Sequence, residues 1–330
     1  MGPSSPCWAW TAVAGTLSPM REFELISRLM PMLPRNDFVV AGAGDDCAVL
    51  DLGDPACHTL YKTDAIVEGV HFLPDAEPEK VGHKALARAL SDVAAMGGMP
   101  VAAVVTLALP AGRDAGWAEG VYRGLCRTAA RWQVAVVGGE TVTNPGHAWL
   151  SVALVGRVAR GKAVMRSGAR AGDALMVSGE LGGSIAGHHL SFEPRLREAA
   201  WLASHHDVHA MIDLSDGLAG DLRHLLAASG GLGAEVLARA LPIRPAARAQ
   251  AREGDLAKPA VLAALTDGED FELLFAVAPG DAVAVMDGWR SAFPNTPIRC
   301  IGKVTTGPGA WLRDARGLQP LPKGGYEHLS

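Results

Sequence analysis

The chain has 330 residues, of which 49% are hydrophobic, so it is long and apolar enough to form two buried cores. Its 30 Lys and Arg against 35 Asp and Glu give a net charge of -5, which excludes a basic footprint for nucleic acid and a polybasic membrane anchor. Five cysteines without a CxxC pair exclude a disulfide framework or a zinc ribbon and favour a reducing, cytoplasmic setting.

Two domains are expected, covering residues 20–160 and 161–330. Residues 1–19 contain Trp8 and Trp10 but no positive region and only a short apolar run, so an unstructured extension before a start at Met20 is preferred to a signal peptide. Apolar residues then recur at helical spacing until Pro31, which predicts a short amphipathic helix over residues 23–30. No apolar stretch reaches the ~18 residues of a membrane span, so no membrane segment is expected.

In the first half, apolar runs separated by glycine or proline predict a sheet with helices on one face. Strands are expected at residues 48–52, 59–66, 101–109, 134–137 and 149–158, and helices at 81–93 and 114–132. This order is typical of an α/β or α+β layer, and α/β (α+β) is the fold class expected for the chain.

The second half reads as another α/β unit. A strand at 174–178, a helix at 218–228 and a strand at 271–277 are expected, with a surface excursion over 242–258. His205 and His209 are four residues apart, but no third ligand is spaced nearby, so a solvated helix face is preferred to a metal pair.

The segment AGAGDDCAVL, residues 41–50, places Asp45 and Asp46 side by side where a turn runs into a strand. Adjacent strand residues point to opposite faces, so one carboxylate can face a site while the other caps the turn or faces solvent. Taken alone, the segment is better explained by an Asx-turn before a hairpin.

Further carboxylates also lie at element ends, beside glycine or hydroxyl residues. Together with Asp46 they are Asp64, Asp92, Asp213, Asp216 and Glu269. Carboxylates brought together repel by ~4 kcal/mol per close pair at an effective dielectric near 20, so such a cluster favours hard cations. Oxygen-only ligands indicate magnesium or calcium, and magnesium with substrate phosphates is the usual arrangement for phosphoryl transfer. An N-cap at Ser215 or Asp216 is the structural alternative for the segment before 218–228.

The familiar nucleotide motifs are absent from the sequence: there is no GxxxxGK[ST] loop and no HRD or DFG pair. An ATP site must therefore have another design. The glycine-rich residues 179–187 could supply backbone amides to a phosphate, although such turns are common.

Seven motifs, taken in order, resemble those of the thiamine-monophosphate kinase family. They are GAGDDCAVL, KTDAIVEGVHF, LSDVAAMGGMP, VVGGET, RSGARAGD, IDLSDGL and GEDFELLF. This family is a branch of the superfamily that includes aminoimidazole ribonucleotide synthetase, selenophosphate synthetase and a hydrogenase maturation protein. The resemblance implies a two-domain aminoimidazole ribonucleotide synthetase-like fold, ATP-dependent phosphorylation of thiamine monophosphate and several magnesium ions. It also implies a homodimer that pairs its N-terminal sheets, with ATP in a groove between domains.

The resemblance assigns roles residue by residue. Its expected metal ligands are Asp46, Lys62, Thr63, Asp64, Asp92, Glu140, Asp213 and Asp216. Catalytic roles are implied for Asp46, Asp92, Asp213 and Asp216. Its expected nucleotide contacts are Tyr122, Gly139, Glu140, Arg166 and Ser215, and its expected substrate contacts are His71, Glu269 and Tyr326.

Three positions depart from the family pattern. Lys62 stands where the family usually has Ser or Thr, so only its carbonyl could take over a metal ligand. Glu140 replaces the commoner Asp, and Tyr326 stands where the family often has Trp. His71, Tyr122 and Arg166 each have a structural alternative, as a buried histidine, a packing tyrosine and a surface cation.

The sequence leaves two alternative functions open. A sister ATP-dependent synthetase would need a reactive cysteine in an N-terminal glycine-rich segment or at the C-terminus, and this chain ends in His328-Leu329-Ser330. A nucleotide-binding scaffold without catalysis would need fewer aligned metal ligands than the acidic motifs of both halves provide.

Overall fold

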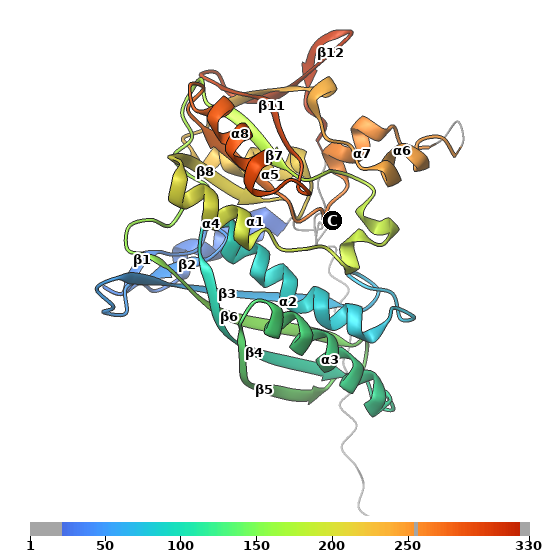
Figure 1. Cartoon of the computed structure of the whole chain (residues 1–330). Coiled ribbons are helices and arrows are strands. Elements are labelled where there is room, and N and C mark those ends of the chain that lie inside the picture. Colours follow the sequence, from blue (N-terminus) through green and yellow to red (C-terminus); the bar gives the residue numbers. More distant parts are fainter. Residues whose placement is uncertain (1–21, 254–256, 324–330) are drawn as a thin grey trace, which may run out of the picture. The chain divides into compact units, whose positions relative to one another are not determined.

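The computed structural model describes residues 22–253 and 257–323 (Figure 1). These residues divide into two units, residues 22–34, and residues 35–253 with 257–323. Within the first unit, helix α1 (Glu22–Leu29) continues into a 3-10 turn η1 (Met30–Met32), which confirms the short helix predicted from the spacing. The expected extension over residues 1–19 and the substrate contact Tyr326 lie outside the described residues.

The larger unit begins with a six-stranded sheet in the order β1-β2-β3-β6-β4-β5. Its strands are β1 (Val39–Ala41), β2 (Ala48–Leu50), β3 (Cys57–Val67), β4 (Met99–Leu109), β5 (Ala135–Thr143) and β6 (Trp149–Ala159). Only β4 and β5 pair in parallel; the other neighbours in this sheet are antiparallel. The long central strands alternate buried and more exposed residues, which leaves one face packed and one face open.

Helices α2 (Pro78–Ala95) and α3 (Ala115–Arg131) lie beside each other on the packed face (Figure 1). They approach closely because each contributes a glycine at the contact. A Cβ at Gly82 would lie 1.8 Å from the carbonyl oxygen of Val121, and one at Gly124 would lie 1.8 Å from that of Glu79. The small residues therefore set the distance between the two helices.

A second sheet has seven strands in the order β13-β12-β9-β11-β7-β10-β8. They are β7 (Ala174–Ser178), β8 (Val208–Asp213), β9 (Gly233–Leu237), β10 (Leu273–Val277), β11 (Ile298–Thr305), β12 (Gly309–Asp314) and β13 (Gly317–Pro320). The accompanying helices are α4 (Leu196–His205), α5 (Leu218–Ala228), α6 (Pro245–Gln250), α7 (Ala260–Thr266) and α8 (Ala282–Ala292). Short 3-10 turns are η2 (Ser184–Ala186), η3 (His188–Leu190) and η4 (Ala238–Ala240). The mixed α/β class is thereby confirmed.

Helix α2 is buried on nearly all sides, because it packs on the first sheet and α3 and also on α4 and β8. One apolar cluster accordingly runs from Leu60 and Leu150 of the first sheet through α2 to Met176 and Phe275 of the second. A separate cluster fills the other face of the second sheet. A helix that is covered on both faces needs small apolar residues all round, as the alanines of α2 provide.

Several local predictions need correction. His209 does not lie on a helix face: it belongs to β8, and its buried ring bonds Asp173 at 2.8 Å. Strand β5 continues through the predicted Gly-Gly stop to Thr143. The predicted surface excursion at 242–258 contains helix α6 and the buried Ile243. Among the described residues, no helix is both long and apolar enough to cross a membrane.

Candidate active site

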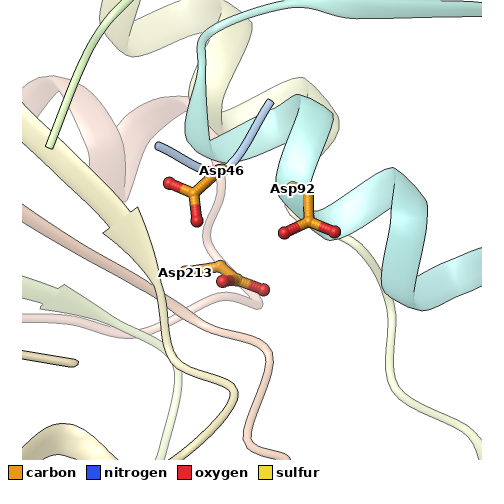
Figure 2. Close-up of side chains that lie close together, drawn as sticks. All are labelled: Asp46, Asp92 and Asp213. Atoms are coloured by element: carbon orange, nitrogen blue, oxygen red, sulfur yellow. The ribbon is translucent and has the colours of Figure 1, made fainter. Parts of the chain in front are cut away.

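Three carboxylates from distant parts of the chain meet inside the larger unit. Asp46 precedes β2, Asp92 lies in the last turn of α2, and Asp213 ends β8. All three are buried, and one oxygen of each lies within 4.8 Å of the others. Figure 2 shows the three side chains turned toward one another from their separate elements. We call these residues the acidic triad.

The two aspartates of the DD pair divide their roles as predicted, although both lie in the turn before β2 and not in the strand. Asp46 enters the triad, whereas the carboxylate of Asp45 accepts the backbone N–H of Asp46 at 3.0 Å. Asp45 also accepts the backbone N–H of Arg166, at 3.0 and 3.2 Å to its two oxygens. Asp45 therefore holds the turn and the RSGARAGD loop together, and Asp46 is free to face the site.

Within the described residues, each triad member accepts a hydrogen bond from one side-chain donor. Arg166 donates from Nη2 to Asp46 Oδ1 at 2.6 Å, and Lys62 donates from Nζ to Asp92 Oδ1 at 2.9 Å. The hydroxyl of Ser91 donates to Asp213 Oδ2 at 2.6 Å. A carboxylate at a helix C-terminus is unfavourable because it opposes the helix dipole. The positive charge of Lys62 beside Asp92 offsets this effect.

Burial makes the triad costly to ionise. Burial first, and then the neighbouring Asp46, raises the pKa of Asp213 to about 7. Burial also raises the pKa of Asp92 well above its usual value, although Lys62 opposes this. Both shifts disfavour the charged form when no further cation is present, so the protein alone does not fully neutralise the cluster.

The donor set fits a hard divalent cation. Oxygen Oδ2 of Asp46 is buried and has no hydrogen-bond partner among the described residues. An unsatisfied buried carboxylate oxygen costs free energy unless something binds it, and carboxylate oxygens are the ligands that magnesium and calcium prefer. Magnesium, as expected from the sequence, therefore fits these residues.

A second charged network lies around Lys84 of α2, whose side chain is fully buried. Its ammonium donates to the backbone carbonyl of His71 at 2.6 Å and to Glu269 Oε2 at 2.7 Å. Arg88, one turn further on, donates to Asp64 Oδ2 at 2.9 Å and lies 3.7 Å from Glu269. Lys84 thus links two predicted substrate contacts, while Arg88 pairs with a predicted metal ligand.

The state of Asp64 follows from these neighbours. Burial opposes its ionisation, but the charges of Arg88 and Lys62 outweigh burial and lower its pKa. Asp64 is therefore an ionised carboxylate already paired by arginine, outside the acidic triad.

The loop that carries Glu269 has an unusual backbone. Glu269 and Phe271 both have positive φ, 63° and 51°, which costs side-chain-bearing residues free energy. Hydrogen bonds to the neighbouring loop hold it: the Glu269 N–H donates to the Ser215 carbonyl at 2.6 Å and the Phe271 N–H to that of Leu214 at 2.8 Å. Backbone strain of this kind concentrates at functional sites.

The first sheet places its predicted ligands on opposite faces. Lys62 and Asp64 face α2, since they bond residues of that helix. Thr63 lies between them on the strand, is exposed, and bonds Ser151 across the open face at 3.2 Å. Through the pairings of β6 and β4, exposed Glu140 on β5 shares that open face. The triad and these two residues therefore occupy different sides of the sheet.

Four other predicted residues lie on strand β5, on helix α3 and in the turn before α5. A Cβ at Gly139 would come 1.9 Å from the Val105 carbonyl, so strand packing alone requires this glycine. Tyr122 is half-buried on α3 and packs against the core. Ser215 and Asp216 precede α5, whose N-cap is Gly217 rather than either of them. The amides of Asp216 and Gly217 instead donate to Asp221, each at 3.1 Å.

Sequence reasoning missed Lys84, Arg88, Ser91 and Asp221 as parts of the site. All four are polar side chains on helices α2 and α5, where a helical pattern alone suggests solvent exposure. The signal that could have found Lys84 is its position among apolar and alanine residues on every side of α2.

The fold and site define a mixed α/β protein of the AIR synthase type, in which carboxylates from both halves of the chain build one centre. Residues 44–158 match the family described as AIR synthase related protein, N-terminal domain. A thiamine-monophosphate kinase of Rhodopirellula baltica is 41% identical over 84% of this chain and 87% of the relative. The thiamine-monophosphate kinase of Escherichia coli K12 is 33% identical over 94% of this chain and 98% of its own. The chain belongs to the thiamine-monophosphate kinase family.

A solved structure agrees with this assignment. AaThiL complexed with AMPPCP and TMP matches 96% of this chain and 100% of its own, with a TM-score of 0.76 and 30% identity. The fold expected from the motifs is therefore confirmed.

Proposed function

We propose that this protein transfers the γ-phosphoryl group of ATP to the phosphate of thiamine monophosphate, giving thiamine diphosphate and ADP. The convergence of Asp46, Asp92 and Asp213 carries this proposal, since three buried carboxylates can hold the metal ions that would neutralise phosphate charge in phosphoryl transfer. The relative solved with AMPPCP, an ATP analogue, and TMP supports the choice of both substrates.

Magnesium ions would be held by the acidic triad, with the free Oδ2 of Asp46 as an available ligand. When bound, magnesium would neutralise phosphate charge and orient the reacting groups. Arg166 keeps the other oxygen of Asp46 in place, and Ser91 does the same for Asp213. These residues thereby fix the direction in which the carboxylates point.

Transfer is proposed to be direct, without a phosphorylated enzyme. An oxygen of the acceptor phosphate forms a bond to the γ-phosphorus as the bond to the β,γ-bridging oxygen breaks and ADP leaves. Cys47 is the thiol beside the triad, and burial, followed by the charge of Asp92, raises its pKa, which makes it a poor nucleophile. His71 accepts the Val67 N–H on Nδ1 at 3.1 Å, so this nitrogen is occupied.

The substrate side is proposed to lie around His71 and Glu269, which Lys84 holds together. Thr63, Asp64, Glu140 and Asp216 are retained as proposed metal ligands and Tyr122, Gly139, Arg166 and Ser215 as proposed nucleotide contacts. Tyr326 remains a proposed substrate contact.

A homodimer through the open face of the first sheet is proposed. That face and its edge expose large apolar side chains, including Tyr61, Val104 and Val137 at 51%, 42% and 66% of their surface. A second copy that covered this face would bury them and would also enclose Thr63 and Glu140. The free thiols Cys47, Cys57, Cys126 and Cys300 fit a cytoplasmic location.

The test is a direct assay. Purified protein is incubated with ATP, magnesium and thiamine monophosphate, and thiamine diphosphate and ADP are measured by chromatography. Asp213→Asn should lose most of the activity, whereas Asp207→Asn, with a side chain 81% exposed, should keep it. Nucleotide binding without product would favour the scaffold, and ATP cleavage without thiamine diphosphate would favour a sister synthetase.

A further inference from the structure

Lys62 places a positive charge inside the proposed metal site. Its Nζ lies 2.9 Å from Asp92 Oδ1, and the side chains of Lys62 and Asp92 are only 24% and 9% exposed. The position follows from β3, where Leu60, Lys62 and Asp64 share the face toward α2. A lysine on this face points toward α2, where its ammonium bonds Asp92.

The charge balance around the triad shows what Lys62 contributes. In the described part of the chain, two cationic side chains bond to the three triad carboxylates, Arg166 to Asp46 and Lys62 to Asp92. With all three ionised, one formal negative charge remains, and loss of Lys62 would leave two. Because a low-dielectric site magnifies each uncompensated charge, this difference changes how many cations the site takes up.

We propose that Lys62 is a built-in cation that occupies the place of one divalent ion beside Asp92, so that this protein binds fewer metal ions than a variant with a hydroxyl residue there. This inference rests on the proposed magnesium site. The ammonium already takes Asp92 Oδ1 and leaves that residue one oxygen for a metal. It also lies among Asp92, Asp64 and Asp46, which a second cation would have to approach against its charge.

Two consequences follow for the metal-free and metal-bound states. Without metal, Lys62 stabilises the triad, and its removal leaves more uncompensated charge. With metal, Lys62 competes for Asp92, and its removal opens a ligand oxygen. Replacing Lys62 by Thr should therefore lower the melting midpoint of the metal-free protein and enlarge its rise on metal addition.

The experiment counts ions directly. Purified wild-type, Lys62→Thr and Lys62→Arg proteins are dialysed against manganese with AMPPCP, and bound manganese is measured by elemental analysis. Melting midpoints are recorded with and without metal. Lys80→Thr on α2 is the matched control, since Lys80 is 52% exposed and pairs only with Glu77 in the described chain.

The expected result is one more manganese ion per chain in Lys62→Thr, or on the order of tenfold tighter binding of the last ion. Lys62→Arg and Lys80→Thr should match the wild type. Equal ion numbers, affinities and metal-induced midpoint shifts in wild type and Lys62→Thr would overturn the inference. So would the absence of ion binding in all four proteins, which would also remove the proposed metal site. Normal ion counts without thiamine diphosphate formation would instead refute the proposed function alone.

Discussion

The hydroxyl of Ser91 donates a 2.6 Å hydrogen bond to Asp213, and this contact joins helix α2 to the end of strand β8. Both residues are buried. A serine in the first half of the chain thus fixes a carboxylate of the second half. The orientation of Asp213 depends on the packing of α2. The geometry of the acidic triad therefore depends on how both sheets pack against this helix.

The first prediction concerns pH. The pKa of Asp213 in the folded protein, about 7, is raised above its ordinary value near 3.8. Between these values the folded state binds more protons than the unfolded state, so the metal-free protein should lose stability as pH rises from about 4 to 7. Asp213→Asn should flatten this fall in urea unfolding measured at several pH values, and Asp207→Asn should not. Parallel curves for wild type and Asp213→Asn would show that Asp213 is not the titrating group.

The second prediction concerns stabilisation by ligands. Magnesium with AMPPCP should raise the melting midpoint, since a ligand at a hundredfold excess over its dissociation constant adds ~2.7 kcal/mol. The midpoint should rise by several degrees, at roughly 2–4 °C per kcal/mol. Asp92→Asn and Asp216→Asn should blunt this rise, with Asp207→Asn as the control. A midpoint indifferent to the ligands, or an equal rise in every variant, would mean that the carboxylates do not form one site.

The third prediction concerns Lys84. Lys84→Met keeps the approximate length of the side chain but removes the ammonium that donates hydrogen bonds to Glu269 and to the His71 carbonyl. Removing one partner of a buried pair typically costs 3–5 kcal/mol, and about 3 kcal/mol is expected here because Arg88 lies 3.7 Å from Glu269. The KM for thiamine monophosphate should rise in steady-state assays. Lys80→Met should change stability by less than about 0.5 kcal/mol, and an equal effect of both substitutions would contradict the role given to Lys84.

The fourth prediction concerns the contact of α2 with α3. Gly82→Ala should lower the free energy of unfolding by about 1–3 kcal/mol, because the new Cβ would lie 1.8 Å from a backbone oxygen and the helices must separate. Gly280→Ala, with no heavy atom within 4 Å of the added Cβ, should be close to neutral. Denaturant unfolding compares the two, and a neutral Gly82→Ala would show that the helices can move apart freely.

The fifth prediction concerns the acceptor. Thiamine should be phosphorylated at least on the order of a hundredfold more slowly than thiamine monophosphate, because metal ions held by the triad would bind an acceptor phosphate, which the hydroxyethyl group of thiamine lacks. Rates with the two acceptors at equal concentration provide the measurement. Comparable turnover would refute the proposed geometry of the acceptor site.

Local pattern accounts for much of the fold. Strand β7 and helix α5 begin and end where apolar runs and glycine breaks predict them. Strand β5 was predicted too short because Gly138 and Gly139 resemble a stop. In the sheet, Gly139 is instead the residue that lets β5 lie against the Val105 carbonyl. A glycine that ends a strand and one that permits close pairing look alike in sequence.

The site was harder to predict than the fold. The motifs select Asp46, Asp92 and Asp213, but they do not distinguish these from Asp64, which Arg88 draws away from the triad. The distinction depends on Arg88 and Asp92, which lie one turn apart on α2, and on Lys62 and Asp64, which face them from β3. The role of Lys84 was not predicted because a lysine on a helix usually reaches solvent. The packing of α2 against both sheets buries this one.

The positions of the triad residues in the chain, 46, 92 and 213, also bear on biosynthesis. A growing chain that has made only its first sheet holds two of the three carboxylates, together with the lysine that already pairs one of them. Such an intermediate therefore lacks the complete form of the proposed metal site. Asp213 joins the proposed metal site only when β8 packs beside α2, where Ser91 donates a hydrogen bond to its carboxylate. Metal binding at the proposed site should therefore follow the packing of both sheets around α2.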